Sequence, residues 1–135
     1  MTKENEGNLE IIYLQVMENL PNIKNQLSSK DLFGAFKMQL EKDFEQSNFS
    51  IDFVETLEPN YNGIQEKIVF ELQRNEAKTD SNLMRLLNRI DISEVQLKKY
   101  LNEYKTENRF YVIAELIIKR VLQKVVIKHH YKKNG

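Results

Sequence analysis

Two adjacent histidines, His129 and His130, carry the side chains of this 135-residue chain that are best suited to acid–base catalysis or metal binding. Adjacent side chains on a helix project about 100° apart, so the pair cannot hold one ion from one face as histidines four positions apart can. Nucleophilic catalysis also requires a base and an orienting group in fixed geometry. Both histidines lie where we expect a helix end to fray, so the sequence predicts no catalytic residue and no metal site.

A phosphate-binding loop is a second kind of site that a sequence can reveal. Such a loop needs closely spaced glycines, because backbone N–H groups must approach the anion. The glycines of this chain are far apart, at Gly7, Gly34, Gly63 and Gly135. The sequence therefore predicts no nucleotide site of this kind and no cofactor.

Carboxylates offer acid–base or metal chemistry at two places. Glu41, Asp43 and Glu45 are close in sequence but point in different directions on a helix, which favours a solvated helix face. Asp91 lies between two expected helices. It is either a buried functional carboxylate or a turn residue that accepts backbone N–H bonds near Ser93, and we favour the turn.

Basic side chains gather toward the end of the sequence, with six of them and no acidic residue from Lys119 to Lys133. One interpretation is a patch for an anionic partner, since lysines make salt-sensitive contacts with nucleic-acid phosphates. The interpretation we favour is that these cations complement the acidic N-terminal half and the negative end of a helix dipole. The candidate anion-binding residues are Lys124, Lys128, Lys132 and Lys133.

The net charge of zero conceals two halves of opposite charge. Residues 1–60 carry 11 acidic and 5 basic side chains, a net charge of −6, whereas residues 61–135 carry 9 acidic and 15 basic, a net charge of +6. We expect the two halves to attract each other. The overall balance argues against a dedicated nucleic-acid binder.

Composition indicates one domain built of long helices. The chain is 41% hydrophobic and 30% charged, and its 4 glycines and 2 prolines leave few obligatory turns. The lack of cysteine excludes disulfides and thiolate metal sites and suits a reducing compartment. The first residues do not resemble a signal peptide, and no window is apolar enough to span a membrane. We therefore expect a cytoplasmic protein without a membrane partner.

The longest apolar segment, residues 109–131, is expected to form a central helix. At 100° per residue its apolar side chains cover about half of the circumference, so it needs several helical partners. A second apolar edge falls in the polar half of the helix and predicts self-association unless the first or second helix of the chain covers it. The residues predicted at the centre of the core are Ile113, Ile117, Val121 and Leu122, and those of the second edge are Val112, Leu116 and Ile127.

Five further helices are expected where apolar side chains recur every three or four residues. Ser28 or Ser29 can cap the second of them by accepting a hydrogen bond from a free N–H group. Ser93 and Gln96 have the spacing of a capping box at the start of another. The first helix covers about residues 8–20, and the others contain residues 33–44, 61–72, 83–90 and 97–104.

The connections are less regular than the helices. Pro21 is expected to end the first helix, because proline disfavours helical angles in the residue before it. Residues 48–58 alternate like a strand but lack a clear partner, so we expect an extended connection, followed by a turn at residues 62–63. Disorder is expected at residues 1–7 and 132–135.

Two phrases, LLNRIDIS at residues 86–93 and AELIIKRVLQKV at residues 114–125, resemble segments of a group of small all-helical bacterial proteins without an assigned function. The resemblance covers about the last third of the chain. Neither phrase is a catalytic motif, so the resemblance implies a helical fold and no site residue.

These observations predict an all-α fold, a single-domain bundle of five or six helices around a long C-terminal central helix. We interpret the protein as a non-catalytic protein-interaction or structural module that is able to self-associate. An accessory nucleic-acid-binding protein that uses the basic C-terminal stretch is the alternative hypothesis. An enzyme with an unrecognised site is the third.

Overall fold

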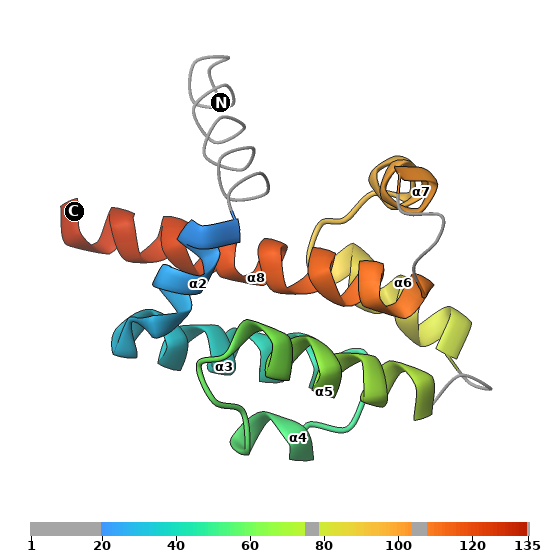
Figure 1. Cartoon of the computed structure of the whole chain (residues 1–135), viewed down its shortest axis with the longest axis horizontal. Helices are drawn as coiled ribbons and strands as arrows, with labels where there is room; N and C mark the ends of the chain where they lie inside the picture. Colours follow the sequence, from blue (N-terminus) through green and yellow to red (C-terminus); the bar gives the residue numbers. More distant parts are fainter. Residues whose placement is uncertain (1–19, 75–78, 104–107, 135) are drawn as a thin grey trace.

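The computed structural model describes residues 20–74, 79–103 and 108–134, and every regular element in these ranges is a helix (Figure 1). This confirms the predicted all-α bundle with its long C-terminal helix. None of these helices combines the length and the hydropathy that crossing a membrane requires. The helices are α2 (Leu20–Ser28), α3 (Lys30–Glu45), α4 (Asp52–Glu55), α5 (Tyr61–Arg74), α6 (Thr79–Arg89), α7 (Glu94–Glu103) and α8 (Arg109–Asn134).

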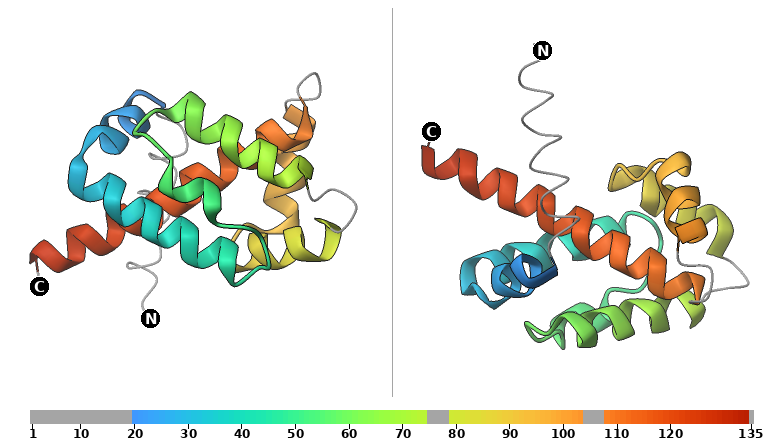
Figure 2. Two further views of the ribbon diagram at one scale, coloured as in Figure 1. Left: turned by 90° about the horizontal axis from the view of Figure 1, so that it is seen from below. Right: turned by 45° about the horizontal axis from the view of Figure 1, so that its top comes forward.

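Helix α8 crosses the molecule, with α3 and α5 packed on one side of it and α7 on the other (Figures 1 and 2). Asn108 caps its start, because the side-chain Oδ1 accepts the Phe110 N–H at 2.9 Å. The predicted centre of the core is confirmed. Its four residues are all buried within the main hydrophobic cluster: Ile113, Ile117, Val121 and Leu122.

The second apolar edge of α8 is covered in the structure, since Val112 and Leu116 are 0% and 1% exposed. Positions 112, 116 and 119 share one face of a helix. On that face the Lys119 Nζ lies 5.9 Å from the centre of the Tyr100 ring of α7. Val112 and Leu116 are therefore internal, and the predicted self-association cannot use these two side chains.

Local capping begins two helices as predicted. The Ser29 Oγ accepts the Leu32 N–H at 3.5 Å at the start of α3. At the start of α7 the Ser93 Oγ accepts the Gln96 N–H at 3.1 Å, and the Gln96 Oε1 accepts the Ser93 N–H at 3.3 Å. Both arrangements satisfy N–H groups that have no partner inside the helix.

Two helices end on residues in the left-handed backbone region. After α6, Asp91 has φ 60°, and the next residue, Ile92, donates its N–H to the Leu87 carbonyl at 2.9 Å. This is the Schellman arrangement, which satisfies free carbonyls at a helix end. Asn48, with φ 67°, closes α3 in the same way. Asn and Asp tolerate this conformation better than other non-glycine residues. Asp91 therefore lies in a turn, as predicted, and its carboxylate accepts a hydrogen bond from the Arg120 side chain.

Residues 48–58 contain a single helical turn, α4, and no strand. The Phe44 ring lies 5.5 Å from that of Phe49 and 5.3 Å from that of Phe53, measured between ring centres. Val54 is also buried. The segment is thus correctly predicted not to form a strand, but it is not extended throughout, because a turn of helix brings these side chains onto the bundle.

Two helix starts differ from the prediction. Pro21 lies in the first turn of α2, so residues 20–28 form a helix where the sequence predicted the end of one. Proline fits a first turn because its φ is already helical and its missing N–H would have no partner there. Asn62 and Gly63 lie in the first turn of α5, since Asn60 caps that helix by accepting the Gly63 N–H at 2.9 Å.

The predictions for the ends of the chain have different outcomes. Helix α8 continues to Asn134, so residues 132–134 are helical where disorder was expected. The helix expected at residues 8–20 lies outside the described residues except for Leu20. The disorder expected at residues 1–7 lies outside them as well.

Candidate functional site

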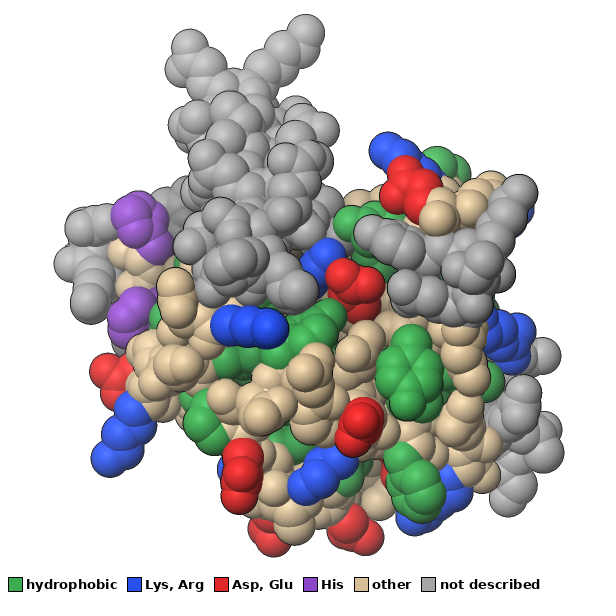
Figure 3. Space-filling model, in the orientation of Figure 1, with side chains coloured by type: hydrophobic (Ala, Val, Ile, Leu, Met, Phe, Trp, Pro, Cys, Tyr) green, Lys and Arg blue, Asp and Glu red, His purple; other side chains and the backbone are tan. Residues whose placement is uncertain are grey.

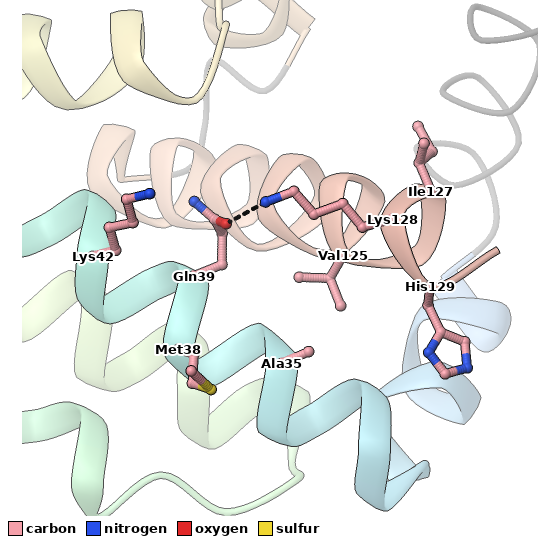
Figure 4. A pocket seen from close by; sticks show the side chains of 8 residues that line it. All are labelled: Ala35, Met38, Gln39, Lys42, Val125, Ile127, Lys128 and His129. Atoms are coloured by element: carbon pink, nitrogen blue, oxygen red, sulfur yellow. Dashed lines mark hydrogen bonds between the residues drawn. The ribbon is translucent and has the colours of Figure 1, made fainter. Parts of the chain in front are cut away.

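A groove of about 810 Å³ lies between α3 and the C-terminal half of α8 (Figure 4). Both helices contribute apolar and polar side chains to it. Among the described residues, those that line it are Ala35, Met38, Gln39 and Lys42 of α3, and Val125, Ile127, Lys128 and His129 of α8.

Helix α3 can line this groove because it carries two stripes. One of them, the aromatic stripe of Phe36, Leu40 and Phe44, is buried in the core. Ala35, Met38 and Lys42 have the i, i+3, i+7 spacing of a neighbouring stripe, which turns toward the groove. The sequence reasoning missed this stripe, although its spacing is visible once the aromatic stripe is assigned to the core.

The walls of the groove are apolar and its rim is cationic. Val125 of α8 is buried and points toward α3, whereas Met38 is 74% exposed (Figure 4). Lys42 and Lys128 are exposed at the rim, with His129 half-buried beside them. The described lining contains no carboxylate. Such a surface can bury the apolar side of a ligand and attract acidic groups at its edges.

A buried carboxylate fixes one wall of the groove. Asp43 is 1% exposed, and both of its carboxylate oxygens accept hydrogen bonds from the Gln39 Nε2, at 3.1 and 3.2 Å. The amide oxygen of Gln39 then faces the other way and accepts a hydrogen bond from the Lys128 Nζ at 3.4 Å (Figure 4). The interpretation of Asp43 as part of a solvated face is therefore wrong, because its helix face packs against α6 and α8.

Basic side chains of α6 and α8 surround this carboxylate and the α6–α7 turn. The Arg89 Nε lies 3.7 Å from the Asp43 Oδ1. The Arg120 Nη2 lies 3.3 Å from the Asp91 Oδ2, and Arg120 also bonds Gln123 through its Nη1. These contacts attach α3 and the α6–α7 turn to α6 and α8.

Lys124 points into this polar cluster, where its Nζ donates a 2.8 Å hydrogen bond to the Arg89 carbonyl. Burial lowers its pKa below the ordinary value, because a charged ammonium is less favourable away from water. The neighbouring Asp43 and Asp91 oppose this change, while Arg120 and Arg89 add to it. Lys124 is thus engaged inside the fold and is not arranged as a phosphate contact.

The lowered pKa of Lys124 predicts how stability changes with pH. Below its folded-state pKa, Lys124 is charged in both the folded and the unfolded chain, so the cost of burying the charge lowers the free energy of unfolding in full. Above that pKa the folded chain binds fewer protons than the unfolded chain, whose lysine pKa is about 10.4, so the free energy of unfolding rises with pH. We expect the wild type to gain stability relative to Lys124→Met as the pH rises from neutrality toward about 10.4, the unfolded-state pKa of lysine.

Urea unfolding at several pH values in this range measures that difference. Lys99→Met, which removes an exposed lysine of α7, serves as the matched control and should show no comparable trend. A difference between wild type and Lys124→Met that stays constant over this range would contradict the expected role of burial.

The structure separates the residues that the sequence grouped as candidates. Val112 and Leu116 belong to the core, whereas Ile127 is half-buried and lines the groove. Lys124 faces the polar cluster and Lys128 the groove. The side chains of Lys132 and Lys133 lie outside those that the structure describes.

The two histidines lie at the end of the molecule where α8 emerges (Figure 3). Acidic and basic side chains alternate over the face shown there. Among the described residues, no three His, Asp or Glu side chains are grouped so that they could hold a metal ion. Comparison of the chain with protein-family models, with curated proteins and with solved structures finds no match.

Proposed function

We propose that this protein is a non-catalytic protein-interaction module whose α3–α8 groove binds an amphipathic helix of a partner protein. The observation that carries the proposal is the apolar stripe of α3 left open in the groove, with Met38 three-quarters exposed between Ala35 and Lys42. Positions 35 to 42 span about 10 Å along the helix axis. The i, i+3, i+4 and i+7 anchors of a partner helix span the same length, which suits a helix-in-groove contact.

The charges at the rim determine what kind of helix fits. Lys42 and Lys128 are exposed, and the described lining has no carboxylate to balance them. A partner helix with acidic residues beside its apolar stripe would place opposite charges at this rim, which favours encounter and orientation. The proposed partner is therefore an acidic amphipathic helix. As part of the proposal we place the module in the cytoplasm, because the sequence has no cysteine and so suits a reducing compartment.

The nucleic-acid hypothesis and the enzyme hypothesis stay predictions. Within the basic stretch, Lys124 bonds the Arg89 carbonyl inside the fold, so one of the four candidate cations is not available to a phosphate. The groove offers a larger and more specific surface than these cations. We therefore prefer the helix-binding function.

A phage-display library of peptides of about 16 residues, long enough to form a helix on binding, is screened for binding to the full chain. We expect selection against the full chain to enrich peptides with apolar residues at i, i+3 or i+4 and i+7, flanked by Asp or Glu. Met38→Glu should weaken these peptides at least about tenfold, because a buried methionine contributes roughly 1.5–3 kcal/mol and the new carboxylate repels the acidic ligand.

Matched variants show whether the groove is the site. Val95 of α7 is 77% exposed and lies outside the groove, so Val95→Glu should leave binding unchanged. Lys42→Glu should weaken binding and Lys99→Glu should not, although both change the net charge equally. Selection that yields no helical peptide, or peptides that bind Met38→Glu as tightly as the wild type, would refute the proposal.

A further inference from the structure

We infer that Met38 is a redox-sensitive modification site, at which oxidation of the side-chain sulfur to the sulfoxide stops the α3–α8 groove from binding its partner helix. The inference rests on the proposed function, because it concerns the regulation of that same groove. Three features of the described residues carry it: the exposure of Met38, the apolar walls that it shares, and the position of Lys42 beside it.

Met38 is the described methionine that an oxidant in solution reaches most easily. It is 74% exposed although it belongs to the lining of the groove. Figure 4 shows its sulfur apart from the other side chains drawn there. The other described methionine, Met84 of α6, packs against the hydrophobic core and is only partly exposed. The chain has no cysteine, so no thiol of its own competes for the oxidant.

The modification is the transfer of an oxygen atom from hydrogen peroxide to the sulfur. The thioether sulfur of Met38 attacks one peroxide oxygen, a sulfur–oxygen bond forms, and the O–O bond breaks. The proton on the transferred oxygen passes to the leaving oxygen, which departs as water. The sulfur is thereby oxidised and the peroxide reduced. Methionine sulfoxide reductases reverse the change with a dithiol, which becomes a disulfide while the oxygen leaves as water.

The apolar walls of the groove make this change unfavourable for binding. Ala35 and Val125 line the groove together with Met38, so the apolar stripe of a partner helix packs against all three. A sulfoxide is polar, and its oxygen requires a hydrogen-bond donor once water is removed. An apolar stripe supplies no donor. Oxidation therefore removes apolar burial and also leaves a polar group buried without a partner.

The charge at the rim is affected as well. Lys42 follows Met38 by four positions, so the two side chains are neighbours on one face of α3. The sulfoxide oxygen is an acceptor within reach of the Lys42 ammonium, and a hydrogen bond between them engages a cation that the acidic partner would otherwise meet. Oxidation thus weakens both the apolar and the charged contacts of the proposed partner.

The fold itself does not depend on the Met38 sulfur. Phe36 and Leu40, on either side of Met38 in α3, are fully buried and hold this helix in the core. Met38 lies outside that hydrophobic cluster. We therefore expect oxidation of Met38 to change binding without changing the free energy of unfolding.

Peroxide treatment of the full chain tests the inference. Mass spectrometry of proteolytic fragments locates the added oxygen, which we expect on Met38 before Met84. The probe is a peptide that was selected against the unoxidised chain and contains no methionine or cysteine. Its affinity should fall about tenfold or more when Met38 is oxidised. Treatment with methionine sulfoxide reductases should restore it.

Matched variants separate Met38 from the other methionines. Met38→Leu keeps an apolar side chain of similar volume without the sulfur, so it should bind the peptide and stay insensitive to peroxide. Met38→Gln, which is polar, should bind as weakly as the oxidised wild type. Met84→Leu should stay as sensitive to peroxide as the wild type. All three variants keep Met1 and Met17, so oxidation of those residues affects them equally.

Four results would overturn the inference. They are oxidation of Met84 before Met38, unchanged affinity of chains oxidised at Met38, an equal loss of affinity in peroxide-treated Met38→Leu, and a loss that accompanies a lower free energy of unfolding. Each of them leaves peptide binding by the unoxidised chain, and with it the proposed function, in place. Failure of the unoxidised chain to bind any helical peptide would instead refute the proposed function, together with the regulation inferred from it.

Discussion

Ile117→Ala is expected to lower the free energy of unfolding by about 2–5 kcal/mol, as truncation of a fully buried isoleucine does elsewhere. Ile117 is 0% exposed and lies on the central helix α8, which contacts α3, α5 and α7. The removed methyl and methylene groups lose their burial, and a rigid surround cannot fill the cavity. Urea unfolding of the purified chain measures the change.

Two further variants set the scale for this result. Ile117→Val should cost only about 0.5–1.5 kcal/mol, because a smaller volume is removed from the same place. Val95→Ala, at an exposed position of α7, should remain within about 0.5 kcal/mol of the wild type. A loss below about 0.5 kcal/mol for Ile117→Ala would contradict the central position of α8 in the core.

The central helix could be predicted from the sequence because its evidence is local. Apolar side chains between residues 109 and 131 cover about half of the helix circumference, and only the interior of a bundle can accommodate such an arc. The capping box of Ser93 and Gln96 was predictable for the same reason, since both partners lie within one turn of α7.

Features that depend on tertiary packing could not be predicted in this way. The same periodicity that identified α8 could not show that Val112 and Leu116, in its polar half, are buried in the folded bundle. The alternating pattern around Phe49 and Phe53 matched a strand, and only the position of Phe44 in the folded bundle explains why both rings pack against a helix instead. Tertiary contacts override local propensity in both cases.

The groove was missed because it depends on how α3 and α8 lie relative to each other, which no sequence pattern contains. Ala35, Met38 and Lys42 read as the outer face of a helix until the positions of α3 and α8 are known. The burial of Asp43 was missed for a related reason, since its partner Arg89 is 46 residues away and belongs to the basic half of the chain. The ion pair of Asp43 and Arg89 is one specific contact between the acidic half, residues 1–60, and the basic half, residues 61–135.

Asp43→Ala is expected to lower the free energy of unfolding by about 3 kcal/mol, at the low end of the cost of breaking a buried ion pair. Residue Asp43 is 1% exposed, and its removal leaves the Gln39 amide without its hydrogen-bond acceptor and the Arg89 guanidinium without its ion-pair partner. The Arg89 side chain is 33% exposed and can regain some water, which limits the loss. Urea unfolding at neutral pH measures it.

A double-variant cycle separates the loss of the pair from the loss of packing. Asp43→Leu combined with Arg89→Met removes both charges together, and well-packed apolar replacements of buried ion pairs are often neutral. We therefore expect the double variant to be more stable than Asp43→Leu alone, with a coupling of about 1–3 kcal/mol. Additive effects of the two substitutions, or a cost below about 1 kcal/mol for Asp43→Ala, would show that the buried carboxylate does not depend on Arg89 and does not hold α3 to α6.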